Sequence, residues 1–235
     1  MSCFIIMIYG ILLLSIVGTS SSSLVHPARA STDGGLFEDF EEEDFEEESS
    51  IQICCAWGRA LEDGRLTYFI DDDDSSEGEQ QAVRNAIQEW DIKIEPLELE
   101  EESSKETSDI TIEFGEDNEE AEEIAGQTMM IANGYGFLVN AQVTIYKNVQ
   151  GYEFDTSTVG QVAKHEMGHA LGLGHANFDG NLMAERINYG TGTVSECEID
   201  AVIEANYWKL GDEEGDDDDV GNNNPDRPRY DSIAC

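Results

Sequence analysis

Residues 165–175 read HEMGHALGLGH and contain three of the four histidines in the 235-residue chain. His165 and His169 are four residues apart. Positions i and i+4 of an α-helix share one face, with Cβ atoms about 5–6 Å apart, so both imidazoles can bind one metal ion. Glu166 lies beside this pair and can hydrogen-bond a metal-bound water without being a ligand.

The end of this motif supplies a third ligand. Gly172 has no Cβ, so it can take a left-handed conformation that ends the helix and reverses the chain. His175 then reaches the metal from a loop. Three neutral imidazoles leave the fourth position of Zn²⁺ open to water, which is typical of a catalytic site. The alternatives are exposed histidines on an amphipathic helix and a zinc site kept only for structure. Glu166 argues against the second.

The remaining elements predict an α+β fold. Ser76 and Glu79 form a capping box before an apolar helical stripe that ends at Trp90. Two more helices are expected, one over 158–171 and one from the Ser195 cap to about Trp208. Alternating or β-prone residues predict strands over 66–70, 97–99, 110–114, 129–131 and 141–146. We therefore expect a mixed sheet of about five strands with three main helices, and a zinc site on the second helix.

The spacing of one methionine relates the motif to a known family. Met183 follows His175 by eight residues, and HExxHxxGxxH followed by such a methionine resembles the metzincin metalloproteases, whose Met-turn lies beneath the zinc. Within that clan the chain is most similar to the matrixins, because LTYFI, DITIEF, AQVTIY and HEMGHALGLGH appear in matrixin order over roughly 57–208. The resemblance implies a metzincin-like twisted sheet and a zinc-dependent endopeptidase.

The resemblance also implies a role for each site residue. Zinc on His165, His169 and His175 would activate a water, and Glu166 would act as the general base that hydrolyses a peptide bond. The strand over 141–146 would be the sheet edge that pairs with a peptide or protein substrate. The segment 186–193 would form a wall of the substrate pocket.

Several positions depart from the matrixin pattern. Ala176 stands where matrixins typically have Ser, and Glu185 stands where some metzincins have a supporting Tyr. The chain lacks the additional histidines of a structural zinc site and the PRCGxPD pro-segment. The rival interpretations are a catalytically degenerate extracellular interaction protein that retains zinc, and an enzyme that hydrolyses a non-peptide amide. Intact Glu166 favours an enzyme over the first rival.

The composition along the chain predicts four segments. Residues 1–30 combine an apolar run with small residues, as in a secretory signal peptide. Residues 31–50 are expected to form an acidic linker or pro-segment, and residues 51–210 the metalloprotease domain. Residues 211–235 are expected to form an acidic disordered tail. We expect a secreted monomer. The alternative is membrane anchoring by an uncleaved N-terminal segment, since its first residues carry no Lys or Arg.

Charge excludes whole classes of partner. The chain has 52 Asp and Glu against 12 Lys and Arg, a net charge of −40, so binding to nucleic acid or to anionic lipid is not expected. Acidic clusters such as 71–74 could bind Ca²⁺, but no EF-hand spacing supports this, and we interpret them as solvated surface.

Four cysteines are expected to be cross-linked. Cys54, Cys55, Cys197 and Cys235 form an even set in an exported chain, which allows three pairings. Adjacent cysteines rarely bond to each other, so we expect bonds from Cys54 and Cys55 to Cys197 and Cys235. The alternative is buried or free thiols.

We predict that the folded protein is more stable in concentrated salt. A net charge of −40 spread over the chain destabilises a compact state through self-repulsion. Salt weakens this repulsion, since the Debye length falls from about 10 Å at about 0.1 M to about 3 Å at about 1 M. Thermal unfolding in increasing KCl should show a rising midpoint. A protein most stable in dilute salt would contradict the hypothesis.

Overall fold

The computed structural model describes residues 48–115, 124–186, 192–211 and 232–235. The predicted signal peptide, most of the predicted linker and most of the predicted tail therefore lie outside the described residues. Within the described part of the chain, no helix is long and apolar enough to cross a membrane.

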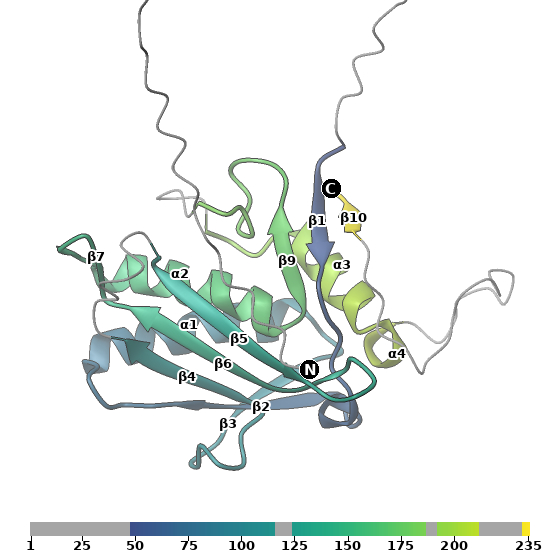
Figure 1. Cartoon of the computed structure of the whole chain (residues 1–235), viewed down its shortest axis with the longest axis horizontal. Coiled ribbons are helices and arrows are strands. Elements are labelled where there is room, and N and C mark those ends of the chain that lie inside the picture. Colours follow the sequence, from purple (N-terminus) through teal and green to yellow (C-terminus); the bar gives the residue numbers. More distant parts are fainter. Residues whose placement is uncertain (1–47, 116–123, 187–191, 212–231) are drawn as a thin grey trace, which may run out of the picture. The chain divides into compact units, whose positions relative to one another are not determined.

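The main sheet has five strands, as expected (Figure 1). Its order is β3 (Glu98–Glu101), β2 (Arg65–Ile70), β4 (Ile110–Gly115), β6 (Leu138–Tyr146) and β5 (Gly126–Ala132). The first four strands run parallel to their neighbours, and β5 pairs antiparallel with β6. The mixed α+β architecture predicted from the sequence is confirmed.

The edge of this sheet differs from the prediction. The segment 141–146 belongs to β6, which lies between β4 and β5, so the expectation that it forms the edge is wrong. A tight turn at 133–137 returns the chain from β5 directly into β6. Because β6 pairs with β5 on one side and with β4 on the other, the edge position passes to β5.

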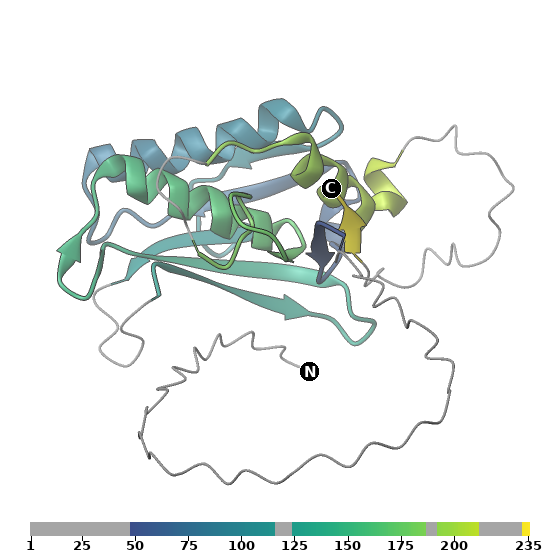
Figure 2. The same cartoon turned by 90° about the horizontal axis from the view of Figure 1, so that it is seen from above.

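Two long helices lie side by side on one face of the sheet (Figures 1 and 2). They are α1 (Glu77–Lys93) and α2 (Thr156–Ala170). The predicted capping box at Ser76 begins α1, and the apolar stripe that ends at Trp90 is buried. The indole Nε1 of Trp90 donates to the carbonyl oxygen of Lys164 at 3.0 Å. This bond ties α1 to α2 one residue before the zinc motif.

A second, three-stranded sheet was not predicted. Its order is β10 (Ser232–Ala234), β1 (Ser50–Ile53) and β9 (Leu173–Ala176), and both pairs are antiparallel. The expected disordered tail therefore needs correction at its end, because residues 232–234 form a strand. A pair of two-residue strands, β7 (Asn148–Val149) and β8 (Tyr152–Glu153), forms a separate hairpin before α2.

The third predicted helix is interrupted at Asn206. It consists of α3 (Glu196–Ala205), which begins at the predicted capping box, and α4 (Tyr207–Leu210). Asn206 is buried. Its side chain accepts from the backbone nitrogen of Trp57 at 2.9 Å and donates to the carbonyl oxygen of Leu171 at 3.0 Å. These bonds connect the short 3₁₀ region around Arg59–Leu61 and the end of α2 to the C-terminal helices.

The disulfide pairing also differs from the prediction. Cys54 bonds to the adjacent Cys55, and Cys197 bonds to Cys235. The pairing of β10 with β1 brings Cys235 to α3, which carries Cys197, and their Cα atoms lie 5.5 Å apart. Cys54 and Cys55 then remain for each other. The rule that adjacent cysteines avoid bonding failed here because the fold placed the other two thiols together.

We predict that proteolysis under non-reducing conditions releases one peptide pair joined through Cys197 and Cys235. A peptide containing Cys54 and Cys55 should be lighter by two hydrogens than its reduced form. Mass spectrometry with and without reductant checks both. A peptide that links residue 54 or 55 to residue 197 or 235 would contradict this pairing.

Candidate metal centre

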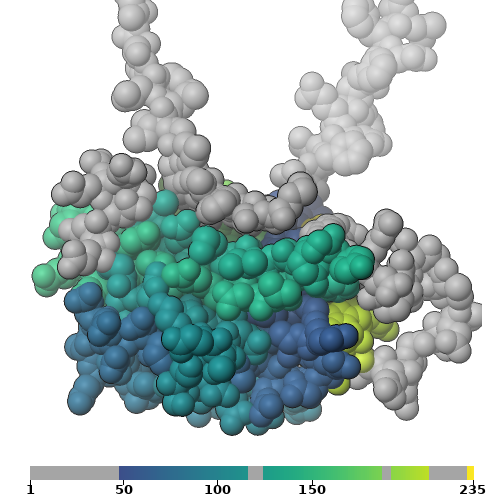
Figure 3. All heavy atoms as spheres, turned by 60° about the horizontal axis from the view of Figure 1, so that its bottom comes forward, coloured from purple at the N-terminus to yellow at the C-terminus, as the bar shows by residue number. Residues whose placement is uncertain are grey.

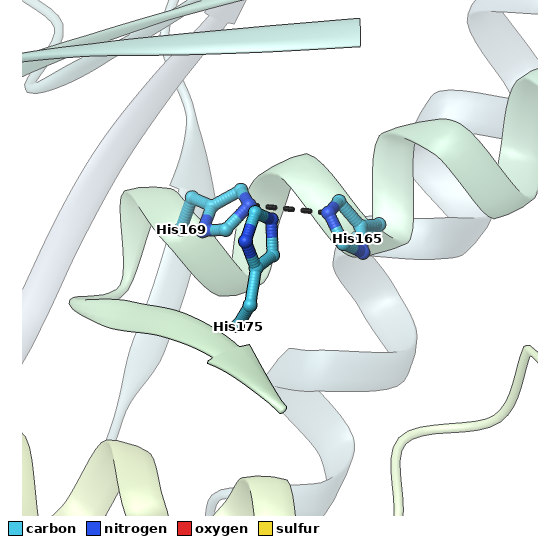
Figure 4. Close-up of side chains that lie close together, drawn as sticks. All are labelled: His165, His169 and His175. Atoms are coloured by element: carbon cyan, nitrogen blue, oxygen red, sulfur yellow. Dashed lines mark hydrogen bonds between the residues drawn. The ribbon is translucent and has the colours of Figure 1, made fainter. Parts of the chain in front are cut away.

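Three histidines meet at the junction of α2 and β9. His165 and His169 lie on α2 and His175 lies on β9, and their nearest ligand nitrogens are all within 4.8 Å of one another. Figure 4 shows the three rings facing a common point. Gly172 has φ +109°, the left-handed turn that the sequence predicted between the second and third histidine. The structure thus brings the three predicted ligands together.

Backbone carbonyls determine which ring nitrogens face the centre. The Nδ1 atom of His165 lies 2.7 Å from the carbonyl oxygen of Leu182, and the Nδ1 atom of His169 lies 2.8 Å from that of Leu173. A carbonyl oxygen can only accept, so both Nδ1 atoms carry the proton. In the neutral rings both Nε2 atoms then present lone pairs.

These lone pairs face each other without a proton between them. The Nε2 atoms of His165 and His169 are 3.1 Å apart, joined by the dashed line in Figure 4. The Nε2 atom of His175 is buried and has no hydrogen-bond partner among the described residues. Buried polar atoms are normally satisfied. A cation bound by the three nitrogens would satisfy all of them, so the residues present fit a zinc ion.

Burial keeps these rings neutral. Desolvation lowers the pKa of His165 to about 4 and places the pKa of His169 well below its ordinary value. Burial also lowers the pKa of His175, and the carboxylate of Glu185, 4.0 Å from its Nδ1, partly opposes this. A neutral imidazole is the form that binds a metal ion, so the site needs no deprotonation step near pH 7.

The predicted Met-turn lies against α2. Met183 is fully buried, and a Cβ on Gly168 would come within 2.4 Å of its sulfur. The backbone nitrogen of Ala176 donates to the carbonyl oxygen of Met183 at 2.8 Å, which connects β9 to this turn. Because Leu182 holds His165, the same turn supports ligands from both elements.

Thr128 is a site residue that sequence reasoning missed. Its hydroxyl donates to Oε2 of Glu166 at 2.7 Å and contacts the Glu166 carbonyl oxygen at 3.1 Å. Burial raises the pKa of Glu166 to about 7, and the Thr128 bond opposes that rise. A Cβ on Gly126 would lie 2.6 Å from Oε1 of Glu166. The start of β5 therefore surrounds the carboxyl group, a relation that becomes visible only once β5 is placed beside α2.

Two other sequence predictions have different outcomes. The segment 187–191, most of the predicted pocket wall, lies outside the described residues. Asp71, Asp72 and Asp73 have carboxylates close together, but Lys105 lies 3.3 Å from Asp71 and the cluster is largely exposed. This arrangement is an ordinary solvated surface, and calcium stays an unsupported possibility.

Comparison with known proteins agrees with this geometry. The sequence profile of the family described as Matrixin matches residues 56–204, which are 149 of the 235 residues. The match contains α1, α2, the five-stranded sheet and all three histidines. No curated protein matches the chain.

We predict that Gly172→Ala destabilises the metal-free protein by about 1–3 kcal/mol. The new Cβ would sit in a left-handed conformation at φ +109° and 2.4 Å from the carbonyl oxygen of Cys55. Gly151→Ala is the matched control, because Gly151 has φ +79° but nothing within 4 Å of the added Cβ. Urea unfolding should show the larger loss for Gly172→Ala. Equal losses would mean that the backbone contact at Cys55 is unimportant.

Proposed function

The chain belongs to the matrixin family, and from that premise we propose that it is a secreted zinc-dependent endopeptidase that cleaves peptide bonds in protein substrates. Membership supports a zinc-dependent peptidase in general. The observation that carries the assignment to this site is the convergence of three histidine side chains, two of which have their Nδ1 atoms held by backbone carbonyls while the buried Nε2 atom of the third has no hydrogen-bond partner among the described residues.

His165, His169 and His175 would hold the zinc ion. When bound, zinc supplies a Lewis acid that lowers the pKa of a coordinated water and polarises the scissile carbonyl. The protein keeps the three rings neutral through burial. It orients two of them through the carbonyl oxygens of Leu182 and Leu173. Such carbonyl partners hold a ligand ring at a defined angle and increase its basicity.

Glu166 would move the proton. Its carboxylate accepts the proton of the attacking water and then returns it to the leaving amine nitrogen, so the enzyme ends in its starting protonation state. In the metal-free protein burial raises the pKa of Glu166 to about 7, so the group can accept and release a proton near neutral pH. Thr128 holds one carboxylate oxygen and leaves the other for this exchange.

Among the described residues, β5 pairs with β6 alone, and its other edge would bind the substrate. β5 stands at the end of the five-stranded sheet, and an extended peptide can add to such an edge through backbone hydrogen bonds. Gly126 and Thr128 lie on this strand and contact Glu166, so the edge leads to the general base. Figure 3 shows the β5–β6 hairpin as a continuous band across one face of the described domain. Its residues 124–146 carry no charged side chain in a chain of net charge −40.

Secretion of the protein is also part of this proposal. It rests on the apolar run and the small residues in 1–30. The four cysteines of the described domain are paired in two disulfides, and such bonds persist in oxidising compartments outside the cytosol.

We predict that Glu166→Ala lowers kcat by about 10²- to 10⁴-fold, because general base catalysis typically contributes that factor. Zinc content should stay stoichiometric, since Glu166 is not a ligand. Casein cleavage in concentrated salt and elemental analysis of the same sample provide the measurements. Glu77→Ala, at an exposed position in the first turn of α1, is the matched control and should cleave normally.

A chelator such as phenanthroline should abolish cleavage by the unaltered protein, and added zinc should restore it. Normal cleavage by Glu166→Ala would show that the role given to this residue is wrong. Zinc binding without cleavage of any protein substrate would instead favour the degenerate interaction protein.

A further inference from the structure

The position of His175 depends on a different element from that of its two companions. His165 and His169 lie on α2, which Trp90 and Met183 hold in place. His175 lies on β9, which belongs to the small three-stranded sheet and not to the main sheet. The convergence of the three rings therefore depends on what holds β9.

β1 contacts β9 on both sides of His175. Ile53 pairs with Leu173 before it, and Ile51 pairs with Ala176 after it. The two backbones are close, because a Cβ on Gly174 would lie 2.9 Å from the Cβ of Gln52.

Hydrogen bonds extend this contact at each end of β9. The backbone nitrogens of Cys54 and Cys55 donate to the carbonyl oxygen of Gly172 at 2.9 and 3.3 Å. At the other end, the backbone nitrogen of Asn177 donates to the carbonyl oxygen of Ser50 at 3.0 Å, and the Asn177 side chain accepts from the Ser50 nitrogen at 2.8 Å. A displacement of β1 would therefore displace β9.

β10 and one disulfide hold β1 from the opposite side. Ile233 of β10 pairs with Ile51, and the backbone nitrogen of Cys235 donates to the carbonyl oxygen of Ser49 at 2.7 Å. The Cys197–Cys235 bond joins this strand to α3, which packs against β1 and β9. Without the bond, β10 would be a three-residue strand at the sheet edge, held against α3 by non-covalent contacts alone.

Both flanking strands lie outside the segment that matches the family. The match covers 56–204, whereas β1 and β10 span 50–53 and 232–234. We propose that β1 and β10, joined to α3 by the Cys197–Cys235 disulfide, position His175 and thereby slow the release of zinc. This inference rests on the proposed zinc site, and it makes Cys197 and Cys235 positioning residues of that site.

The test compares two disulfide-free variants of the full chain. Cys197→Ser with Cys235→Ser removes the bond that secures β10. Cys54→Ser with Cys55→Ser also removes one disulfide, but this bond joins adjacent residues and encloses no loop. The backbone hydrogen bonds from residues 54 and 55 to Gly172 do not require the sulfur atoms. The zinc-loaded proteins are mixed with excess chromogenic chelator, and the rate of zinc release is followed.

We predict that Cys197→Ser with Cys235→Ser releases zinc about tenfold faster than the unaltered protein, the lower end of the loss seen when groups that orient a ligand are removed. Cys54→Ser with Cys55→Ser should release zinc at nearly the unaltered rate. The rise in thermal midpoint on adding zinc should also shrink in the first variant, since that rise reports affinity. If the disulfide only stabilised the fold, its removal would lower the thermal midpoint equally with and without zinc, and the rise on adding zinc would be unchanged.

Each remaining outcome decides the inference. An unchanged release rate in Cys197→Ser with Cys235→Ser, or equal acceleration in both variants, would overturn it while leaving the zinc site intact. An unaltered protein that binds no zinc would overturn the proposed function as well. If the first variant does not fold without zinc, Ile233→Ala keeps the disulfide and trims a side chain packed on the core. It should release zinc faster than the unaltered protein, and an unchanged rate would contradict the inference.

Discussion

Two backbone carbonyls determine which nitrogens of His165 and His169 face the candidate metal centre. The oxygens of Leu182 and Leu173 accept from Nδ1 of His165 and His169, so the opposite nitrogens of both rings present lone pairs toward His175. In a buried setting these lone pairs repel each other unless a cation lies between them. The helix end, the reversal at Gly172 and the turn at Met183 all serve this arrangement, because each positions one carbonyl or one ring.

The environment of the Glu166 carboxyl group depends on the sheet rather than on the helix alone. Glu166 follows His165 in sequence, yet its environment comes from β5, where Gly126 leaves space and Thr128 donates a hydrogen bond. The strand proposed to bind substrate is thus also the strand that approaches the proposed general base. For the proposed function it is therefore the edge position of β5, rather than of β6, that matters.

Two of the wrong predictions have a common cause. The resemblance to the matrixins implied that the strand 141–146 lies at the edge, and the rule that adjacent cysteines rarely bond implied the cysteine pairing across the chain. Both outcomes depend on which segments pair in space. A five-residue turn decided that β5 returns along β6, and the pairing of β10 with β1 decided which thiol met Cys197. Neither the β5–β6 pairing nor the β10–β1 pairing can be recognised from a pattern of residues within a single segment.

The sequence by itself determined the main helices, the strands of the five-stranded sheet and the three histidines that meet at the candidate metal centre. Apolar patterns and capping boxes predicted the three helices and the five main strands, and the spacing HExxHxxGxxH with Met183 predicted three ligands, a base and a supporting turn. These features are local, because a helix places i and i+4 together whatever surrounds it. Only the tertiary structure decided the strand order, the disulfides, the contact of Thr128 with Glu166, and the small sheet that carries His175. These four features depend on contacts between segments far apart in the chain. Backbone hydrogen bonds and burial, rather than the spacing of residues in the sequence, determine which segments come together.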